Sequence, residues 1–193
     1  PRSPYAVAKL FAHWQTVNYR EAYKLFGACG ILFNHESPLR YRRFVTRKIT
    51  AELVEVKHGR RDRMSLGNLE VRRDWGFAGD YVEGMWRTLQ QSKPEDFVFA
   101  TGLSTSIRTF VELAAENLGM PLEWSGSGLA EAGIDRKTGR TVVDISPAFF
   151  RPVELRETVG VAQRARDKLG WAPVTDLPAI VAMMVAADER RLL

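Results

Sequence analysis

Apolar residues recur every three or four positions in several stretches of the chain, which is the spacing of a helix with one buried face. The first stretch follows Ser3 and Pro4, a pair typical of a helix N-terminus, and Gly27 is expected to end it. In another stretch, Asp80 is expected to cap a helix and Trp86 to lie in the core. The remaining helices are predicted over 44–57, 105–118, 163–169 and 176–190.

Two short and almost wholly apolar runs, 28–34 and 96–102, are typical of strands that are buried on both faces. Shorter extended segments are predicted at 64–68, 71–75, 122–124 and 141–145, whereas 125–140 is expected to be rich in loop, with a turn at KTGR. Helices and strands therefore alternate along the chain, and this alternation predicts an α/β fold.

Composition narrows the classes of partner. The chain has 193 residues, of which 45% are hydrophobic, enough to bury a core. Lys and Arg number 28 against 23 for Asp and Glu, so the net charge is +5 and anionic partners are favoured. No nucleic-acid motif accompanies the basic runs RYRR and HGRRDR. They are interpreted as solvated faces, and no nucleic-acid partner is expected.

Cysteine usage argues against a disulfide-bonded or zinc-binding protein, and hydropathy argues against a membrane-spanning one. Cys29 is the one cysteine, which excludes an internal disulfide, and no Cys/His spacing suits zinc, so no metal is expected. A reducing, cytoplasmic location fits this composition. The longest apolar windows, such as IVAMMVAA, fall short of the ~20 residues that span a bilayer, and no membrane partner is expected.

Tyr5 and Lys9 are the first candidates for chemistry. Side chains four residues apart on a helix project from one face, so the Lys9 ammonium is expected beside the Tyr5 phenol. A fixed cation lowers the pKa of a phenol from about 10 and prepares it to accept a proton. The alternative is a half-buried tyrosine beside a solvated lysine, because this spacing is common in helices. The surrounding motifs decide between the two.

These motifs form an ordered series along nearly the whole chain: PRSPYAVAKLFAHW, NHESP, FVTRKIT, LGNLEVRRDWG, GIDRKTGR, RPVE and KLGWAP. In this order they resemble the extended short-chain dehydrogenase/reductases, and within them the GDP-mannose 4,6-dehydratase family. The resemblance implies the last part of a Rossmann-type parallel sheet, interleaved with a smaller α/β substrate domain. Residues 1–34 and 75–103 would belong to the nucleotide-binding domain, and residues 35–74 and 104–193 to the sugar-nucleotide domain.

The implied activity converts GDP-mannose to GDP-4-keto-6-deoxymannose by an internal redox cycle through NADP and loss of water. Assembly into a dimer or tetramer is also implied. A sugar-nucleotide epimerase or reductase of the same superfamily remains an alternative, as does a catalytically silent binding module. The family carries a Gly-rich cofactor loop, a Ser/Thr and a Glu upstream of the tyrosine, and none has a matching position here. The chain is therefore expected to be a C-terminal portion that binds NADP weakly and cannot complete the reaction alone.

The resemblance also assigns roles to single residues. Tyr5 would take the proton of the sugar 4-hydroxyl, and Lys9 would lower its pKa and bond the nicotinamide ribose. Cofactor contacts are implied for Tyr5, Lys9, His35 and Arg40. Substrate contacts are implied for Asn34, Lys48, Arg73, Arg151 and Glu154.

One segment departs from the family pattern. The family commonly has a glycine after the arginine of SPLR, in a loop that reaches toward the neighbouring subunit's cofactor, whereas this chain has Tyr41-Arg42-Arg43. Glycine permits backbone angles that tyrosine resists. The path of this loop, and the subunit contact that it makes, are therefore expected to differ from the family pattern.

Overall fold

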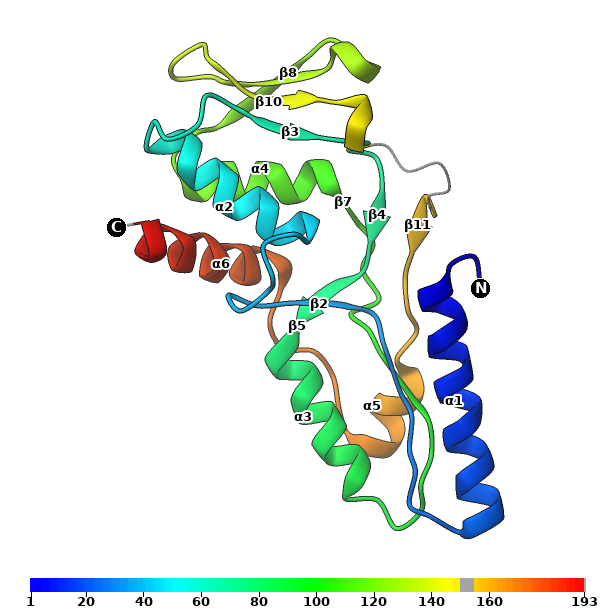
Figure 1. The fold of residues 1–193 in the computed structure, drawn as a ribbon. Coiled ribbons are helices and arrows are strands. Elements are labelled where there is room, and N and C mark those ends of the chain that lie inside the picture. The colour runs from blue at the N-terminus through cyan, green and yellow to red at the C-terminus, as the bar shows by residue number, and fades with distance from the viewer. Residues whose placement is uncertain (150–154, 193) are drawn as a thin grey trace.

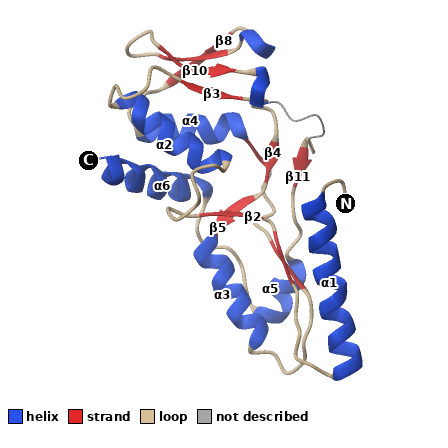
Figure 2. Ribbon diagram, viewed as in Figure 1, coloured by secondary structure: helices blue, strands red, loops and turns tan. Residues whose placement is uncertain are grey.

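The computed structural model describes residues 1–149 and 155–192 (Figure 1). Arg151 and Glu154, two of the implied substrate contacts, lie outside these residues. Helices and short strands form two groups, one at the top of the view and one at the bottom, and further short strands connect them (Figure 2).

The upper group contains a four-stranded sheet. Its strands, in spatial order, are β3 (Met64–Leu66), β10 (Thr141–Ile145), β9 (Ala132–Asp135) and β8 (Leu122–Ser125). Beside it lie α2 (Val45–Lys57), α4 (Ile107–Asn117) and α6 (Leu177–Leu192). Strands β3 and β10 are parallel, and β9 is antiparallel to both of its neighbours. Ile49, Phe110, Val143 and Met184 are fully buried in the core that these elements share.

Strand β9 lies within 125–140, a segment that was expected to be rich in loop and for which no strand was predicted. It follows a short 3-10 helix, η1 (Gly128–Ala130), and pairs with both β8 and β10. Gly133 lies within the strand, and a Cβ atom there would come 3.1 Å from Trp124 and 3.1 Å from Val143. A glycine weakens the sequence signal for a strand, but here it makes room for the two neighbouring side chains.

The lower group is built around two parallel strands. They are β1 (Gly30–Leu32) and β6 (Phe97–Phe99), with α1 (Pro4–Tyr23), α3 (Ala78–Leu89) and α5 (Gln163–Leu169) around them. Tyr81, Phe97, Phe99 and Trp171 form the centre of its core. The predicted domain boundaries, between 34 and 35, 74 and 75, and 103 and 104, stay a prediction.

Short strand pairs join the two groups. They are β2 (Asn34–Glu36) with β5 (Trp75–Phe77), and β4 (Arg72–Arg73) with β11 (Glu157–Thr158) and β7 (Thr105–Ser106). Between β4 and β5, the buried Asp74 carboxylate accepts hydrogen bonds from Thr101, Gly102 and Gly160. The pairs β1–β6, β2–β5 and β4–β11 are parallel, so the predicted α/β class with parallel strands is confirmed.

The first helix begins as its sequence predicts. The Ser3 hydroxyl accepts a hydrogen bond from the Ala6 N–H at 3.1 Å, and Pro4 occupies the first turn. The helix ends at Tyr23, earlier than Gly27, because Lys24 adopts a left-handed conformation with φ of 57°. No described helix is both long and apolar enough to cross a membrane.

Helix α3 shows that two predictions were wrong. The helix begins at Ala78 after the N-cap residue Phe77, so Asp80 lies inside the first turn and does not cap it. The Asp80 carboxylate instead accepts hydrogen bonds from the backbone N–H groups of Val174 and Thr175. Trp86 is 57% exposed, whereas Tyr81 on the same helix is fully buried. The helix therefore packs through a face that the sequence pattern did not select.

Strand β1 also differs from its prediction. It is only three residues long, and its Ile31 side chain is 46% exposed, although a strand buried on both faces was expected. The apolar character of this run is correct, but no described element covers Ile31 fully.

Tyr41 needs no unusual backbone, since Lys24 is the only non-glycine residue with positive φ in the described part of the chain.

Candidate functional site

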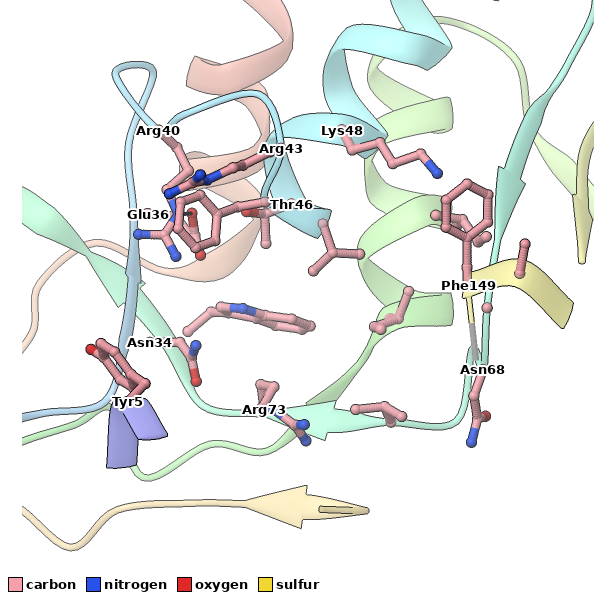
Figure 3. A pocket seen from close by; sticks show the side chains of 18 residues that line it. Tyr5, Asn34, Glu36, Arg40, Arg43, Thr46, Lys48, Asn68, Arg73 and Phe149 are labelled. Atoms are coloured by element: carbon pink, nitrogen blue, oxygen red, sulfur yellow. Dashed lines mark ion pairs between the residues drawn. The ribbon is translucent and has the colours of Figure 1, made fainter. Parts of the chain in front are cut away.

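A cavity of about 690 Å³ lies where elements of both groups meet (Figure 3). Its wall contains the start of α1, strand β2, the segment leading into α2, and parts of β3, β4 and β5. The predicted site residues in this wall are Tyr5, Asn34, Arg40, Lys48 and Arg73. The fold thus gathers predicted site residues that lie up to 68 positions apart in the sequence, the separation of Tyr5 and Arg73.

Tyr5 and Lys9 are neighbours on α1, as their spacing predicts. The Lys9 Nζ lies 5.6 Å from the centre of the Tyr5 ring, and Tyr5 is 71% exposed where the helix begins at the cavity. Lys9 is not part of the cavity wall itself. The arrangement leaves the phenol accessible to a ligand and keeps a cation beside it.

Strand β2 sends its side chains to opposite faces, because successive residues of a strand alternate. Asn34 and Glu36 line the cavity, whereas His35 packs against the Tyr81 ring with 5.2 Å between ring centres. The His35 Nδ1 donates to the Phe33 carbonyl at 2.8 Å, because a carbonyl oxygen can only accept. The predicted site residue His35 is therefore separated from the cavity.

Lys48 lies at the opposite end of the cavity from Arg40 (Figure 3). Its Nζ donates a hydrogen bond to the Ser65 carbonyl at 2.6 Å and lies 3.5 Å from the centre of the Phe149 ring. Burial lowers the pKa of Lys48 because it disfavours the charged form. Phe149 belongs to η2 (Pro147–Phe149), a short 3-10 helix after β10.

Arg73 forms part of the lower wall in Figure 3. Its Nη1 donates to the carbonyl oxygens of Arg72 at 2.7 Å and of Leu155 at 2.8 Å. These bonds connect β4 to the segment that precedes β11. The guanidinium group is therefore held in the wall by backbone oxygens of β4 and of the segment before β11.

Several wall residues were not predicted: Glu36, Arg43, Thr46, Asn68 and Phe149. Glu36 is 2% exposed, and its Oε2 lies 3.2 Å from the Arg40 Nε. Burial raises the pKa of Glu36 to about 7, although Arg40 and Thr46 act in the opposite direction. A signal for Glu36 was present, since it lies two residues after Asn34 and strand residues at this spacing share a face.

One group of side chains that could bind a metal ion lies outside the cavity wall. His13, Cys29 and Asp96 place one potential ligand atom each within 4.8 Å of the others, the one such group among the described residues. Arg20 already bonds both Asp96 oxygens, at 2.7 and 3.1 Å, and the Cys29 N–H donates to the same carboxylate. Burial raises the pKa of the Cys29 thiol, which disfavours the thiolate that a metal needs. We interpret the group as a polar contact that joins α1 to the sheet.

Comparison with solved structures shows the fold of the chain. RMD from Pseudomonas aeruginosa in complex with NADPH matches with a TM-score of 0.81 at 23% identity, over 99% of this chain and 57% of that one. The dTDP-glucose 4,6-dehydratase of Bacillus anthracis str. Ames in complex with NAD matches with a TM-score of 0.77 at 17% identity, over 98% and 53%. The chain therefore has the Rossmann-type α/β fold of these structures.

Sequence comparison then identifies the family. The family model described as GDP-mannose 4,6 dehydratase matches residues 1–184. GDP-mannose 4,6-dehydratase of Sinorhizobium fredii (strain HH103) is 52% identical over 97% of this chain and 54% of its own length. GDP-mannose 4,6 dehydratase 2 of Caenorhabditis elegans is 50% identical over 97% and 49%. The chain belongs to the GDP-mannose 4,6-dehydratase family, and it spans about half the length of these curated relatives.

Proposed function

We propose that the protein carrying this chain converts GDP-mannose to GDP-4-keto-6-deoxymannose, with NADP as an internal redox cofactor. The observation that carries the proposal is the Tyr5–Lys9 pair at a cavity whose wall is rich in cations. Family membership supports the substrate, because the curated relatives are named as 4,6-dehydratases of GDP-mannose.

The size and charge of the cavity support a nucleotide sugar. A volume of about 690 Å³ lies within the ~300–1,000 Å³ range of small-molecule sites. The charged residues of its wall are the cations Arg40, Arg43, Lys48 and Arg73 and the acid Glu36. This excess of positive charge suits a diphosphate, whose oxygens accept hydrogen bonds from guanidinium and ammonium groups.

We propose that Tyr5 accepts the proton of the sugar 4-hydroxyl as hydride leaves the same carbon. The adjacent Lys9 would keep its positive charge beside the phenol and bond the nicotinamide ribose. When bound, NADP supplies the hydride acceptor and returns the hydride later in the cycle. Arg40 would contact it from the cavity side, and His35 from the opposite face of β2, through its Nε2.

At the substrate, Asn34 would bond the sugar nucleotide, and Lys48 and Arg73 would hold the GDP moiety. Arg151 and Glu154 are proposed to complete this contact. The position of Lys48 beside Phe149 supports this assignment. The aromatic ring offers a surface on which a base can stack, and the lysine offers a positive charge for a phosphate.

We also propose assembly into a homo-oligomer in the cytoplasm. No residue of α1 is buried, and Val7, Leu10, Phe11 and Trp14 expose a continuous apolar stripe along it. Exposed apolar patches of this kind mark surfaces that contact other protein. The stripe therefore supports an association of α1 with further protein surface.

Replacement of Tyr5 by phenylalanine tests the proposed reaction. In the protein that carries this sequence, turnover of GDP-mannose should fall by ~10²–10⁴-fold, because one general base is lost. Affinity for GDP-mannose should change little, since the hydroxyl acts in proton transfer. Tyr23→Phe, at an exposed position of the same helix, is the control and should keep full activity. A Tyr5→Phe variant with more than half of the wild-type kcat would contradict the assignment.

A further inference from the structure

Asp188 is a carboxylate buried near the end of α6, with 4% of its side chain exposed. Both of its oxygens bond the Arg47 guanidinium on α2, with Nε–Oδ2 at 2.9 Å and Nη2–Oδ1 at 2.6 Å. The Thr50 hydroxyl donates to Oδ2 at 2.7 Å, and the Arg191 Nη1 donates to Oδ1 at 3.2 Å. One buried acid thus orients two arginines, one on each of two packed helices.

Both arginines use their remaining N–H groups on one stretch of backbone. The Arg47 Nη1 donates to the carbonyl oxygens of Pro38 at 3.2 Å and Arg40 at 2.9 Å. The Arg191 Nη2 donates to the same Pro38 carbonyl at 2.7 Å. A guanidinium group carries its donors in a rigid fork, so a carboxylate that fixes one edge also fixes where the other edge points. The network therefore extends from Asp188 to the backbone of residues 38–40.

The bonded backbone belongs to segment 37–43, which connects β2 to α2 without regular secondary structure. Leu39 in this segment is 87% exposed, so core packing contributes little to its position. The ion pair from Arg42 to α2 is also exposed, and exposed ion pairs contribute little to stability. The bonds to the Pro38 and Arg40 carbonyls therefore provide much of the attachment of the segment to the upper group.

The segment brings the Arg40 side chain into the cavity wall (Figure 3). The Arg40 Nε lies 3.2 Å from the Glu36 Oε2, and its Cζ lies 3.8 Å from the centre of the Phe44 ring. A pair between Asp188 and Arg47 would by itself be enough to join α2 to α6. The additional bonds to the backbone of the segment go beyond this, and they fix the residue that carries the Arg40 side chain.

We propose that Asp188, Arg47 and Arg191 are positioning residues. They fix segment 37–43 and thereby place the Arg40 side chain where it binds the cofactor. The inference rests on the proposed function in that Arg40 contacts NADP. It goes beyond that function because it makes cofactor affinity depend on α6, whose network residues lie outside the cavity wall.

Arg191→Met tests this inference, and Arg190→Met is its matched control. Both substitutions remove one positive charge from exposed neighbours at the end of α6 and keep much of the side-chain length. Arg191→Met removes a bond to the Pro38 carbonyl but leaves Asp188 bonded to Arg47, so the buried carboxylate stays paired. Asp188→Asn would instead break the buried pair and destabilise the fold.

Hydrogen exchange of the backbone amides measures the segment directly, in the protein that carries this chain. We expect residues 37–44 to exchange about fivefold faster or more in Arg191→Met, because the lost hydrogen bond raises the population of the open segment. Amides of α2 and β3 should keep their wild-type rates, whereas a loss of overall stability would raise these rates too. Arg190→Met should exchange as the wild type does throughout.

Calorimetric titration with NADP and with GDP measures the consequence for binding. Arg191→Met should bind NADP about fivefold more weakly and GDP as the wild type does, because Lys48 and Arg73 are held by other backbone carbonyls. In an Arg40→Gln background, Arg191→Met should cause no further loss, because the network acts through Arg40. An effect of Arg191→Met that is equal with and without Arg40 would overturn the inference.

The two measurements separate failure of this inference from failure of the proposed function. If the wild type binds NADP and Arg191→Met matches Arg190→Met in both exchange and affinity, the positioning role is wrong and the proposed function stands. Faster exchange in Arg191→Met without weaker NADP binding would also overturn the positioning role. If the wild type binds no NADP while exchange still depends on Arg191, the proposed function fails and the attachment of the segment to α6 is supported.

Discussion

The Lys48 ammonium lies 3.5 Å from the centre of the Phe149 ring, so a cation of α2 rests on an aromatic side chain that follows β10. The same ammonium donates a hydrogen bond to the Ser65 carbonyl at 2.6 Å, at the edge of β3. Three elements of the upper group thus fix one positive charge at the cavity.

Lys48→Met should weaken binding of GDP about tenfold or more, because a charge-assisted contact to a phosphate is lost while the length of the side chain is kept. Lys93→Met is the control, since Lys93 is an exposed lysine outside the cavity wall. Titration calorimetry with GDP measures both. Equal affinities of the two variants would show that Lys48 does not contact the nucleotide.

Glu36 should make the stability of the chain depend on pH. Burial raises its folded-state pKa from 4.5 to about 7, so the folded state holds the proton more tightly than the unfolded chain. The stabilisation from the protonated form is complete below about pH 4.5 and is lost as the pH rises through about 7. Glu36→Gln keeps the uncharged form at every pH, and above pH 7 it should be more stable than the wild type by up to about 3 kcal/mol.

Urea unfolding of Glu36→Gln and wild type between pH 4 and pH 8 checks this sign. The exposed Glu123→Gln is the control and should follow the wild type at every pH. A difference in unfolding free energy between Glu36→Gln and wild type that stays constant over this range would refute the prediction.

Two tryptophans should respond very differently to the same substitution. Trp171 is 2% exposed, packs edge-on against Phe99 and donates its indole N–H to the Asp80 carbonyl at 2.7 Å. Trp171→Ala should therefore cost about 3–5 kcal/mol of unfolding free energy. Trp86→Ala should change it by no more than about 0.5 kcal/mol, because Trp86 is 57% exposed. Chemical denaturation of the chain measures both, and a large loss in Trp86→Ala would mean that its side chain is packed.

Asp74→Asn should destabilise the junction between the two groups. The two carboxylate oxygens accept hydrogen bonds from the N–H and hydroxyl of Thr101 and from the N–H groups of Gly102 and Gly160. An amide offers one oxygen, so part of this set is left buried without an acceptor, at a cost of about 2–4 kcal/mol. Asp62→Asn, at an exposed position, should cost almost nothing. The prediction fails if the two variants unfold at the same urea concentration.

Local chemistry allowed much of this molecule to be predicted from sequence. The cap at Ser3, the limits of α2 and α5 and the proximity of Tyr5 to Lys9 all depend on residues within a few positions of one another. Backbone preference and helical spacing act over this range, so their effects can be read along the chain. The ordered motifs likewise named five of the eighteen residues that line the cavity.

The buried face of α3 was decided only by tertiary structure. The helix carries apolar side chains on more than one side, and the face that is buried is the one with Tyr81, which meets Trp171 from 90 positions away. The position of Asp80 depends on the backbone of Val174 and Thr175 in the same way. The alternation of β2 was a signal that Glu36 shares a face with Asn34, but Glu36 was not predicted, and its burial depends on α2 and Arg40. Contacts between distant segments set burial, and the local pattern cannot specify which segments will meet.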